Sequence, residues 1–371
     1  MSSTPKVSIV IPVYNAEAYI FQGLQSLQNQ SLKDIEVIMV NDGSIDSSVN
    51  ICRSFAEKDS RFVLISQENG GSAAARRAGM LAAHGEYIGF MDADDWCEAD
   101  MFKKLYSAGN SKNVDIVFCN CYRDYPDYSL MCKKQIRDGF YDRKQIEDEI
   151  LPRTLAGINN KGETNVIRWA NYIRIYKRTL IEAHSIYNDP RFRRCQDLQL
   201  TFEATLYAQS YYYLGDEYLY HNRVVEKSQS RGYTKNQWQK LRILIQRLYE
   251  DVDQFTDIDL HEQMDLCAFF FAVYTCENEG RPCGNLSNEA RWNNLMEICS
   301  DPLCDRFIKT IPVEKLSRVN KEYYKGLMEK NPRILLNANR LRENQAKTGA
   351  VKSKILQVPG VRFIRDVLRH K

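Results

Sequence analysis

The sequence has no long hydrophobic run. The longest apolar stretch after the N-terminal segment, Cys267 to Thr275, is much shorter than the roughly 20 residues that a helix needs to cross a bilayer. The chain opens with MSSTPK and passes directly into VSIVIPVY, without the basic region, longer apolar stretch and cleavage site of a signal peptide. We therefore expect a cytoplasmic protein, with peripheral contact at the inner face of the cell membrane as an open alternative.

The sequence also lacks an excess of charge of one sign. Lys and Arg number 51 against 48 Asp and Glu, so the formal net charge is only +3 and gives little reason to expect a nucleic-acid partner. A basic surface, if present, must be local. The last stretch, Lys347 to Lys371, carries several Lys and Arg among apolar residues and a single acid, Asp366. This basic amphipathic tail has two open interpretations, contact with an anionic membrane surface or a solvated helix packed on its own protein.

A disulfide framework and a zinc site are both disfavoured. The 11 cysteines are an odd, scattered set in a large chain, which fits a reducing compartment better than a secreted scaffold. Cys119 and Cys121 are too close for the usual paired zinc ligands, and no matching second pair with histidines follows. Buried thiols are the better interpretation.

The N-terminal part alternates apolar runs with helical spacing. Strands are predicted at Val7–Val13, Ile35–Val40, Phe62–Ser66 and Glu86–Met91, with a helix over Ser72–Ala83. The first two runs are apolar on successive residues, as in strands that are buried on both faces of a parallel sheet. The pattern predicts a doubly wound, mostly parallel α/β sheet, whose ligands bind at the carboxyl ends of its strands.

Three polar clusters follow these predicted strands. Asn41–Ser44 follows the second strand, Asn69–Gly71 the third and Asp92–Asp95 the fourth, so we expect all three at one edge of the sheet. Carboxylates grouped after a strand suit a divalent cation, and a glycine turn before a helix can present amides to phosphate. Each cluster alone is open to a plainer interpretation: an Asx-turn, a glycine turn without ligand, or an acidic turn that caps the next helix.

The turn after the first strand contains no glycine. It reads PVYNAE, which disfavours a dinucleotide-dependent oxidoreductase because the close approach of backbone to pyrophosphate needs glycine there.

Taken together, the order and spacing of these motifs closely resemble the nucleotide-binding half of family 2 glycosyltransferases of the GT-A fold, of the type that builds bacterial surface polysaccharides. The resemblance covers about Val7 to Trp96 and is carried by VSIVIPVYN, IEVIMVNDGSIDSS, NGGSAAARRAG and GEYIGFMDADD. It implies a donor site formed by Pro12, Tyr14, Asp42, Asn69, Arg76, Asp92 and Ala93. It also implies that Asp94 and Asp92 bind Mn²⁺ or Mg²⁺. Further candidates for contact with the diphosphate are Arg77, Asp95 and His221. Arg77 departs from the family, which commonly has asparagine there.

The second half of the chain resembles the same family more weakly. RWANYIRIYKRTLIEAHSI is similar to the acceptor segment, and Asp197 in Cys195-Gln196-Asp197 stands where relatives carry the aspartate of a Glu-Asp pair that serves as catalytic base. The glutamate is absent here, and a helix-capping role for Asp197 stays open. The resemblance implies an inverting transfer of a hexosyl or N-acetylhexosaminyl group from a nucleotide-sugar, with UDP favoured, to a glycan or lipid-linked glycan acceptor. A non-catalytic scaffold of a membrane polysaccharide assembly is the alternative.

We expect four parts along the chain. Residues 1–112 form the nucleotide-sugar-binding half of the GT-A domain and 113–232 its acceptor-binding half, beginning with a strand at Val114–Cys119. A helical C-terminal region covers 233–346, and the basic tail covers 347–371.

Overall fold

The computed structural model describes residues 4–133, 136–159, 161–162, 166–167, 169–225, 232–281 and 286–356. Its strands are β1 (Val7–Val13), β2 (Ile35–Asp42), β3 (Phe62–Gln67), β4 (Tyr87–Phe90), β5 (Trp96–Cys97), β6 (Ile116–Asp124), β7 (Ser129–Cys132), β8 (Gly139–Asp142), β9 (Arg174–Lys177) and β10 (Ser210–Arg223). Its α-helices are α1 (Ile20–Gln28), α2 (Ser48–Lys58), α3 (Ser72–Leu81), α4 (Met101–Lys112), α5 (Arg143–Gln145), α6 (Leu151–Leu155), α7 (Arg178–Ala183), α8 (Gln196–Tyr207), α9 (Gln237–Gln254), α10 (His261–Gly280), α11 (Asn288–Ser300), α12 (Pro302–Phe307), α13 (Arg318–Met328) and α14 (Pro332–Leu356). Shorter π or 3₁₀ segments are η1 (Ile146–Ile150), η2 (Asn171–Ile173), η3 (Ile308–Thr310) and η4 (Val313–Lys315). No described helix combines the length and the apolar character that crossing a membrane requires.

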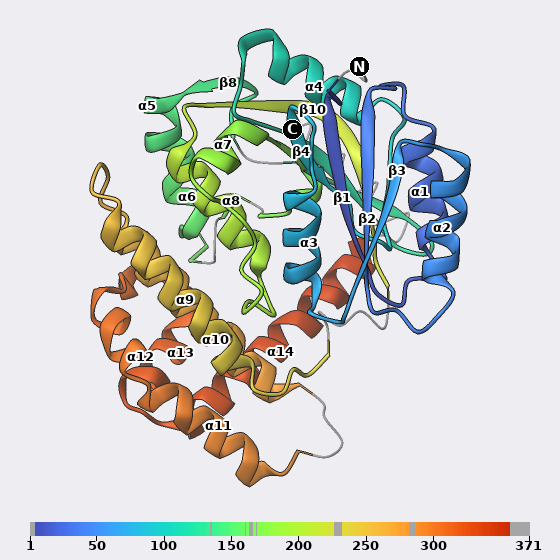
Figure 1. Ribbon diagram of the computed structural model, residues 1–371. Helices are drawn as coiled ribbons and strands as arrows, with labels where there is room; N and C mark the ends of the chain where they lie inside the picture. Colours follow the sequence, from blue (N-terminus) through green and yellow to red (C-terminus); the bar gives the residue numbers. More distant parts are fainter. Residues whose placement is uncertain are drawn as a thin grey trace. The chain divides into compact units, whose positions relative to one another are not determined.

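The N-terminal part forms a parallel sheet with helices on both faces. Strands β3, β2, β1 and β4 are neighbours in that order and all pair in parallel. Helices α1 and α2 lie on one side of these strands and α3 lies on the other (Figure 1). The predicted doubly wound arrangement is therefore confirmed, and each predicted strand or helix in this part ends within two residues of the observed one.

The packing around this sheet explains why the sequences of its strands are continuous apolar runs. Six of the seven residues of β1 are buried, because helices cover both of its faces. Helix α3 approaches β1 closely at Gly79, where a Cβ atom would come within 2.3 Å of Cγ1 of Val10. A larger residue at Gly79 would push the helix away from the sheet, and with it the Arg76 side chain three residues earlier.

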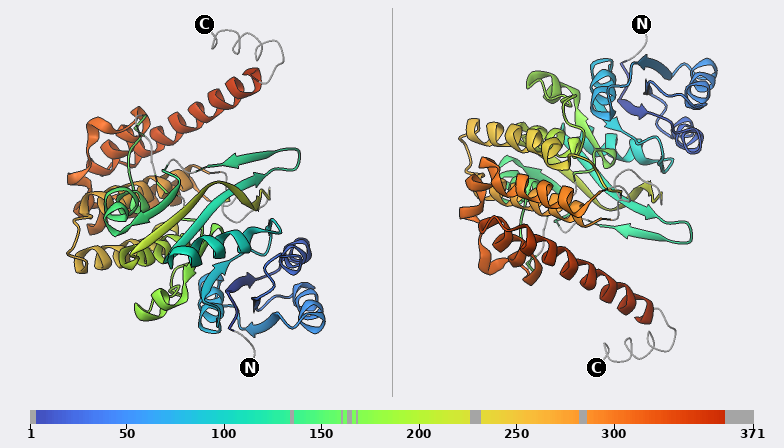
Figure 2. Two further views of the ribbon diagram at one scale, coloured as in Figure 1. Left: turned by 90° about the horizontal axis from the view of Figure 1, so that it is seen from above. Right: turned by 90° about the horizontal axis from the view of Figure 1, so that it is seen from below.

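The second half of the sheet is mixed. Strand β9 pairs antiparallel with both β4 and β6, β6 pairs parallel with β10, and β5, β7 and β8 pair antiparallel at its margin. The strand expected over Val114–Cys119 begins at Ile116 and continues to Asp124. The polar residues after Cys119 remain in a strand because they pair with β7 and β10. The β6–β7 hairpin extends beyond the rest of this sheet (Figure 2).

Close contacts divide the chain into two compact units. The first contains residues 1–157, 165–232 and 239–264, and the second contains 158–164, 233–238 and 265–371. The second unit is helical, and its α13 and α14 pack together, with the Tyr323 hydroxyl donating to Asn339 Oδ1 at 2.6 Å. We retain the finer division at residues 113, 233 and 347 as a proposal.

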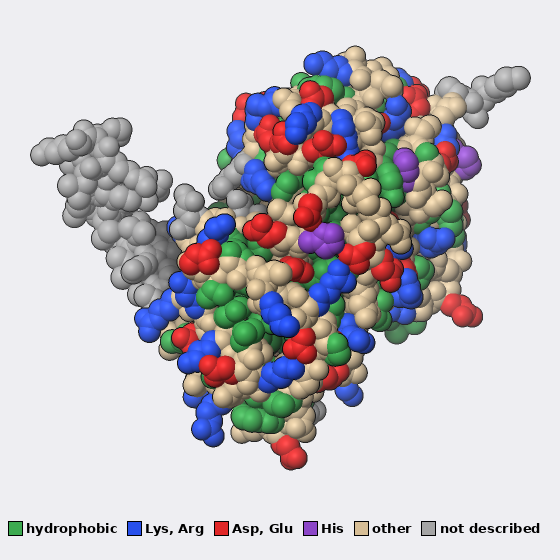
Figure 3. All heavy atoms as spheres, turned by 90° about the vertical axis from the view of Figure 1, so that its left-hand side faces the viewer, with side chains coloured by type: hydrophobic (Ala, Val, Ile, Leu, Met, Phe, Trp, Pro, Cys, Tyr) green, Lys and Arg blue, Asp and Glu red, His purple; other side chains and the backbone are tan. Residues whose placement is uncertain are grey.

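The surface carries charges of both signs. On the face drawn in Figure 3, Lys and Arg side chains alternate with Asp and Glu side chains over the described residues. Helix α14 runs into the first part of the stretch expected to form a basic tail, and residues 357–371 of that stretch lie outside the described residues.

Candidate active site

The acidic turn Asp92–Asp95 follows β4 directly. The Asp95 backbone N–H donates to the Asp92 carbonyl at 3.1 Å and closes the turn, while Ala93 packs against the hydrophobic core of the sheet. The three acidic side chains of this turn have different surroundings. Asp92 and Asp94 are half-buried, whereas Asp95 is only 1% exposed.

Asp95 points into the protein. Its Oδ2 accepts hydrogen bonds from the Tyr220 hydroxyl at 2.8 Å and from Asn222 Nδ2 at 3.0 Å, and its Oδ1 accepts from the Arg223 backbone N–H at 2.7 Å. Burial, together with the charges of Asp92 and Asp94, raises the pKa of Asp95 well above its usual value. These contacts tie the turn to the end of β10. Sequence reasoning gave Asp95 a contact with diphosphate, but its oxygens are occupied by these protein donors.

Asp94 is the least engaged of the three acids. Apart from a contact with its own backbone N–H, its carboxylate makes no hydrogen bond or ion pair with the described part of the chain. Burial and the neighbouring charge of Asp92 raise its pKa to about 6, although Arg223 works in the opposite direction. A half-buried carboxylate beside a second one is stabilised by a cation, and hard divalent ions prefer oxygen ligands.

The metal site that the sequence predicts would need ligands from outside the chain. Within the described ranges no group of three or more His, Cys, Asp and Glu side chains is arranged to hold a metal ion. The Asp94 carboxylate and the Oδ2 atom of Asp92, which Arg76 does not contact, provide fewer ligands than a metal site formed by protein groups alone. Mg²⁺ and similar ions commonly bind through one or two carboxylates plus waters and substrate phosphates, and the residues present fit that pattern.

Arg76 connects the acidic turn to the second half of the sheet. This side chain extends from α3 and is 6% exposed. Its Nη2 donates to Asp92 Oδ1 at 2.7 Å and its Nη1 donates to Asp197 Oδ1 at 2.9 Å. Burial lowers the pKa of the Arg76 guanidinium, but the negative charges of Asp197 and Asp92 have a larger combined effect and raise this pKa above its usual value. Arg76 therefore stays cationic and holds two carboxylates in one place.

Asp197 lies in the first turn of α8. Cys195 occupies the N-cap position in a left-handed conformation, with φ of 55°. Besides Arg76, the Asp197 carboxylate accepts a long bond of 3.4 Å from the Asn171 backbone N–H. Burial raises the pKa of Asp197 above its usual value, while Arg76 counteracts this effect and Asp92 adds to it. A carboxylate whose pKa is raised is a better proton acceptor than an ordinary aspartate.

A buried polar network supports the segment that meets Asp197. The Tyr176 hydroxyl donates to Asn171 Oδ1 at 2.7 Å, and the Thr201 hydroxyl donates to the same oxygen at 3.0 Å. Because Thr201 belongs to α8, these bonds connect η2, β9 and the helix that carries Asp197. The sequence did not single out Asn171 within its segment. Its contacts are with Tyr176 and Thr201, which lie 5 and 30 positions away in the chain.

Asp42 shapes the glycine turn before α3. Its Oδ1 accepts from Gln67 Nε2 at 2.7 Å and from the Gly70 backbone N–H at 2.8 Å, and its Oδ2 accepts from the Gly71 N–H at 2.8 Å. Gly71 has a positive φ of 85°, which only glycine adopts readily in this region. Asp42 thereby joins the ends of β2 and β3 and the start of α3.

The other predicted donor residues lie at the same edge. Val13 of β1 is paired with Asn41 of β2, so Tyr14 and Asp42 follow at one end of the sheet. Pro12 is half-buried, whereas Asn69 and Tyr14 are exposed, Tyr14 by 45%. The exposed ring of Tyr14 thus offers a flat apolar surface at this edge of the sheet.

Two predicted diphosphate contacts are directed elsewhere. The Arg77 guanidinium lies over the Tyr187 ring, 5.3 Å from its centroid. His221 is stacked between the rings of Trp96 and Tyr122, and its nitrogens are hydrogen bonded to Asp124 at 2.9 Å and Glu98 at 3.0 Å. The structure therefore does not place either side chain with Asp92 and Asp94.

Arg223 and Tyr220 are site residues that sequence reasoning missed. Arg223 Nε donates to the Asp94 carbonyl at 2.8 Å, and its guanidinium lies 4.5 Å from the centroid of Trp96. The Tyr220 hydroxyl accepts from the Asp92 backbone N–H at 3.1 Å. Tyr220 directly precedes His221, and the alternation of side chains along a strand directs Tyr220 to the other face, where it meets Asp95. Arg223 lies two residues after His221, and both side chains contact Trp96.

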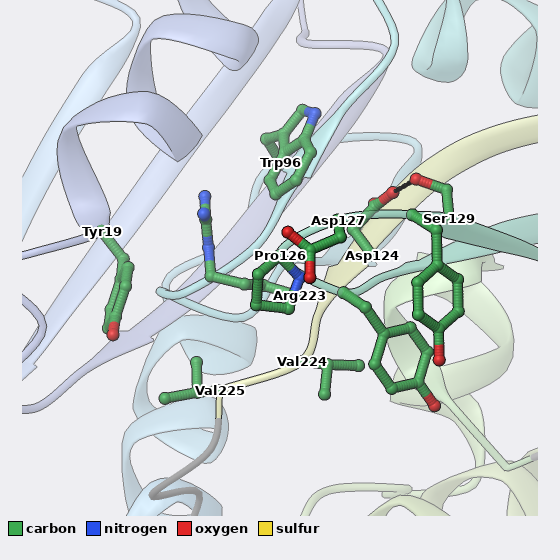
Figure 4. A pocket seen from close by; sticks show the side chains of 11 residues that line it. Tyr19, Trp96, Asp124, Pro126, Asp127, Ser129, Arg223, Val224 and Val225 are labelled. Carbon is green, nitrogen blue, oxygen red and sulfur yellow. Dashed lines mark hydrogen bonds between the residues drawn. The ribbon is translucent and has the colours of Figure 1, made fainter.

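A pocket of about 830 Å³ opens beside the acidic turn. Its walls come from Tyr19, Trp96, Arg223 and the tip of the β6–β7 hairpin, including Tyr125, Asp127 and Tyr128. Figure 4 shows Tyr19 on one side of this space and Ser129 on the other, with Arg223 and Asp127 between them. This turn–hairpin pocket is joined to the acidic turn by Arg223.

Known proteins resemble this chain in sequence and in structure. The family model "Glycosyl transferase family 2" matches residues 8–181. The protein EpsH of Bacillus subtilis (strain 168) is 30% identical over 303 residues, which are 81% of this chain and 85% of EpsH.

Two solved structures are similar to this fold. S. aureus TarS 1–349 in complex with UDP-GlcNAc has a TM-score of 0.64 and 18% sequence identity, covering 92% of each chain. The mannosyltransferase PcManGT from Pyrobaculum calidifontis, in complex with GDP-Man and Mn²⁺, has a TM-score of 0.50 and 15% identity, covering 92% of this chain and 87% of PcManGT. The chain therefore has the GT-A fold that its sequence led us to expect, is a glycosyltransferase and belongs to glycosyl transferase family 2.

Proposed function

We propose that the protein is an inverting, metal-dependent transferase that moves a sugar from a nucleotide-sugar to a hydroxyl group of a glycan or lipid-linked glycan. The observation that carries this proposal is the double contact of Arg76, which holds Asp92 and Asp197 through separate guanidinium nitrogens. A donor-side acid and an acid suited to proton transfer thus lie within reach of one substrate complex.

The donor is a UDP-sugar in this proposal, with a hexosyl or N-acetylhexosaminyl group. Tyr14 and Pro12 flank the nucleobase and Asp42 fixes the turn beneath the nucleotide. The complex of the similar protein TarS with UDP-GlcNAc supports the choice of UDP. Exposed Asn69 and the start of α3 offer polar and backbone donors for the rest of the nucleotide.

Asp92 and Asp94 are the proposed ligands of Mn²⁺ or Mg²⁺. When bound, such an ion stabilises the negative charge that develops on the departing diphosphate. The unengaged carboxylate of Asp94 and the Mn²⁺ complex of PcManGT support this assignment. Arg223 brings a further positive charge to the backbone of Asp94, and we propose it in place of His221 and Arg77 as a contact for diphosphate.

Asp197 is the proposed base. Its carboxylate takes the proton of the acceptor hydroxyl while that oxygen forms a bond to the anomeric carbon, and the bond from that carbon to the nucleotide breaks on the opposite side. One direct displacement inverts the anomeric configuration. Arg76 keeps the carboxylate in place, and the network of Asn171, Tyr176 and Thr201 holds the helix that carries it.

A screen of nucleotide-sugars for Mn²⁺-dependent binding, hydrolysis and transfer tests this function. Asp94→Ala should lose metal-dependent donor binding, whereas Asp197→Ala should bind donor normally and lose transfer. Full transfer by Asp197→Ala would exclude it as the base. Absence of binding to any nucleotide-sugar by the wild-type protein would favour the scaffold alternative.

We further propose that the reaction takes place on the cytoplasmic side, with the basic tail at the inner membrane face. The odd number and scattered spacing of the cysteines support a reducing compartment, and eight of the ten within the described residues are buried. Removal of residues 347–371 should weaken sedimentation with anionic liposomes and leave donor hydrolysis intact. Equal sedimentation of the full and shortened chains would exclude the tail as a membrane anchor.

A further inference from the structure

The turn–hairpin pocket has the chemical character of a carbohydrate site. Its volume of about 830 Å³ lies within the range of roughly 300–1,000 Å³ that small-molecule sites occupy. Sugars present apolar C–H faces and a rim of hydroxyl groups, so they are recognised by flat aromatic rings that stand beside carboxylates and other polar groups. The walls of this pocket combine those features.

One wall is an aromatic platform at the tip of the β6–β7 hairpin. The rings of Tyr125 and Tyr128 are stacked, with centroids 4.6 Å apart and an interplanar angle of 10°. Tyr128 is 55% exposed, so one side of the stack is accessible. The Tyr125 backbone N–H donates to the Tyr128 carbonyl at 2.8 Å, which fixes the turn between them. The platform is therefore formed before any ligand arrives.

Polar groups stand next to this platform. Asp127, between the two tyrosines, is exposed and makes no hydrogen bond or ion pair with the residues that the structure describes. Asp124 is engaged by Ser129 and by His221, which keeps the base of the hairpin in place. The free carboxylate of Asp127 is thus available to accept hydrogen bonds from hydroxyl groups.

The opposite wall leads to the acidic turn. The Arg223 guanidinium lies between the rings of Tyr19 and Trp96, at 5.2 and 4.5 Å from their centroids. The same side chain donates to the Asp94 carbonyl and to Gln22 Oε1, at 2.8 and 2.6 Å. A ligand in the pocket therefore lies against a residue that also contacts the proposed metal ligand.

We propose that this pocket binds a sugar unit of the acceptor, one that precedes the unit carrying the reactive hydroxyl. The ring of this sugar stacks on Tyr128, and its hydroxyl groups donate to Asp127. This inference rests on the proposed transfer to a glycan, and it adds the place and the mode of acceptor recognition. It also gives a function to the tip of the hairpin, which extends beyond the sheet (Figure 2).

Saturation-transfer NMR on the full chain tests the pocket without any catalytic turnover. The probes are chitobiose, lactose and maltose, each without nucleotide. At least one should receive saturation from the wild-type protein, and Tyr128→Ala should weaken its binding by about tenfold, the loss expected for one aromatic contact. Tyr128→Phe should retain binding because it keeps the ring, and Asp127→Asn should weaken it.

Met131→Ala is the matched control, because Met131 is exposed on β7 of the same hairpin and does not line the pocket. Binding that survives Tyr128→Ala, or that Met131→Ala weakens equally, would overturn the proposal, as would absence of binding by all three saccharides. A parallel titration with UDP separates this result from the proposed function. If the wild-type protein binds UDP but no saccharide, only the proposed sugar pocket is rejected. If the wild-type protein does not bind UDP, the proposed donor site is rejected.

Discussion

The carboxylate of Asp197 accepts a 2.9 Å hydrogen bond from Nη1 of Arg76, a residue 121 positions earlier in the chain. The same guanidinium donates to Asp92, so it joins a helix of the nucleotide-binding half to the first turn of α8. A buried cation between two carboxylates fixes their separation and holds Asp197, the proposed base, in place. The active site consequently depends on Arg76 for its assembly as well as for its charge.

Replacement of Arg76 should therefore affect both folding and transfer. Arg76→Ala leaves two half-buried carboxylates without their cation and should lower the free energy of unfolding by about 3–5 kcal/mol. Arg76→Lys keeps the charge but cannot bond both acids with a planar fork, so we expect a smaller loss of stability and a fall in transfer rate on the order of 100-fold. Chemical denaturation and steady-state transfer assays measure the two effects.

Arg61→Lys is the control for the two Arg76 variants. Arg61 forms a comparable ion pair with Asp59, at 2.6 Å, away from the acidic turn. Its replacement should leave the transfer rate unchanged. A transfer rate for Arg76→Lys equal to that of Arg61→Lys would contradict the bridging role.

Neighbouring acids of the same turn should give opposite phenotypes. Asp95→Asn places an amide N–H₂ among the donors Tyr220, Asn222 and Arg223, and the unmade hydrogen bonds should cost about 1–3 kcal/mol of stability. Asp94→Asn meets no such donors and should fold normally, but donor binding should lose its dependence on Mn²⁺. Thermal unfolding and isothermal titration distinguish them. If Asp95→Asn lost Mn²⁺ dependence while keeping wild-type stability, the inward role of Asp95 would be refuted.

The contrast between Asp94 and Asp95 also shows what the sequence could predict. Continuous apolar runs predicted β1, β2 and β4, and the end of each strand placed Tyr14, Asp42 and the acidic turn at one edge. The inward direction of Asp95 could not be predicted, because it depends on residues of β10 that are more than 120 positions away. His221 was selected from its segment, but stacking on Trp96 and Tyr122 turns it away from the acids. No local pattern encodes such long-range pairings.

The glycine turn offers a test of the nucleotide site. Gly71→Ala forces alanine into a conformation with φ of 85°, which should cost about 1–3 kcal/mol, and its Cβ would meet Nη1 of Arg193 at 2.3 Å. The turn should then shift its N–H away from Asp42 and weaken binding of UDP. Gly139→Ala is the matched control, because Gly139 also has a positive φ, of 100°, with no atom near its Cβ position. It should lose stability without losing affinity for UDP, and equal affinities for both variants would argue against a role of the turn in donor binding.

Stability should depend on pH through a buried cluster outside the active site. Arg247 pairs with Glu203 at 3.3 Å and with Asp251 at 3.0 Å, so two carboxyl groups share one cation. Burial and the neighbouring Glu203 raise the pKa of Asp251 to about 8, although Arg247 opposes the shift. The folded chain therefore holds a proton on this cluster at neutral pH that the unfolded chain, with an ordinary aspartate pKa of about 3.9, has already released.

Between the two pKa values of Asp251, the native state binds more protons than the unfolded state. The free energy of unfolding should therefore fall as pH rises from about 4 to about 8. The slope from this cluster should reach at most about 1.4 kcal/mol per pH unit and vanish above pH 8 or so. Asp251→Asn keeps the shape without the titrating proton, so its denaturation midpoint should change less over this interval than that of the wild type. Asp257→Asn, at an exposed position in the same region, should retain the wild-type slope. If Asp251→Asn also retained it, the proton would have to be held elsewhere, because this substitution removes the acid that burial and Glu203 keep neutral.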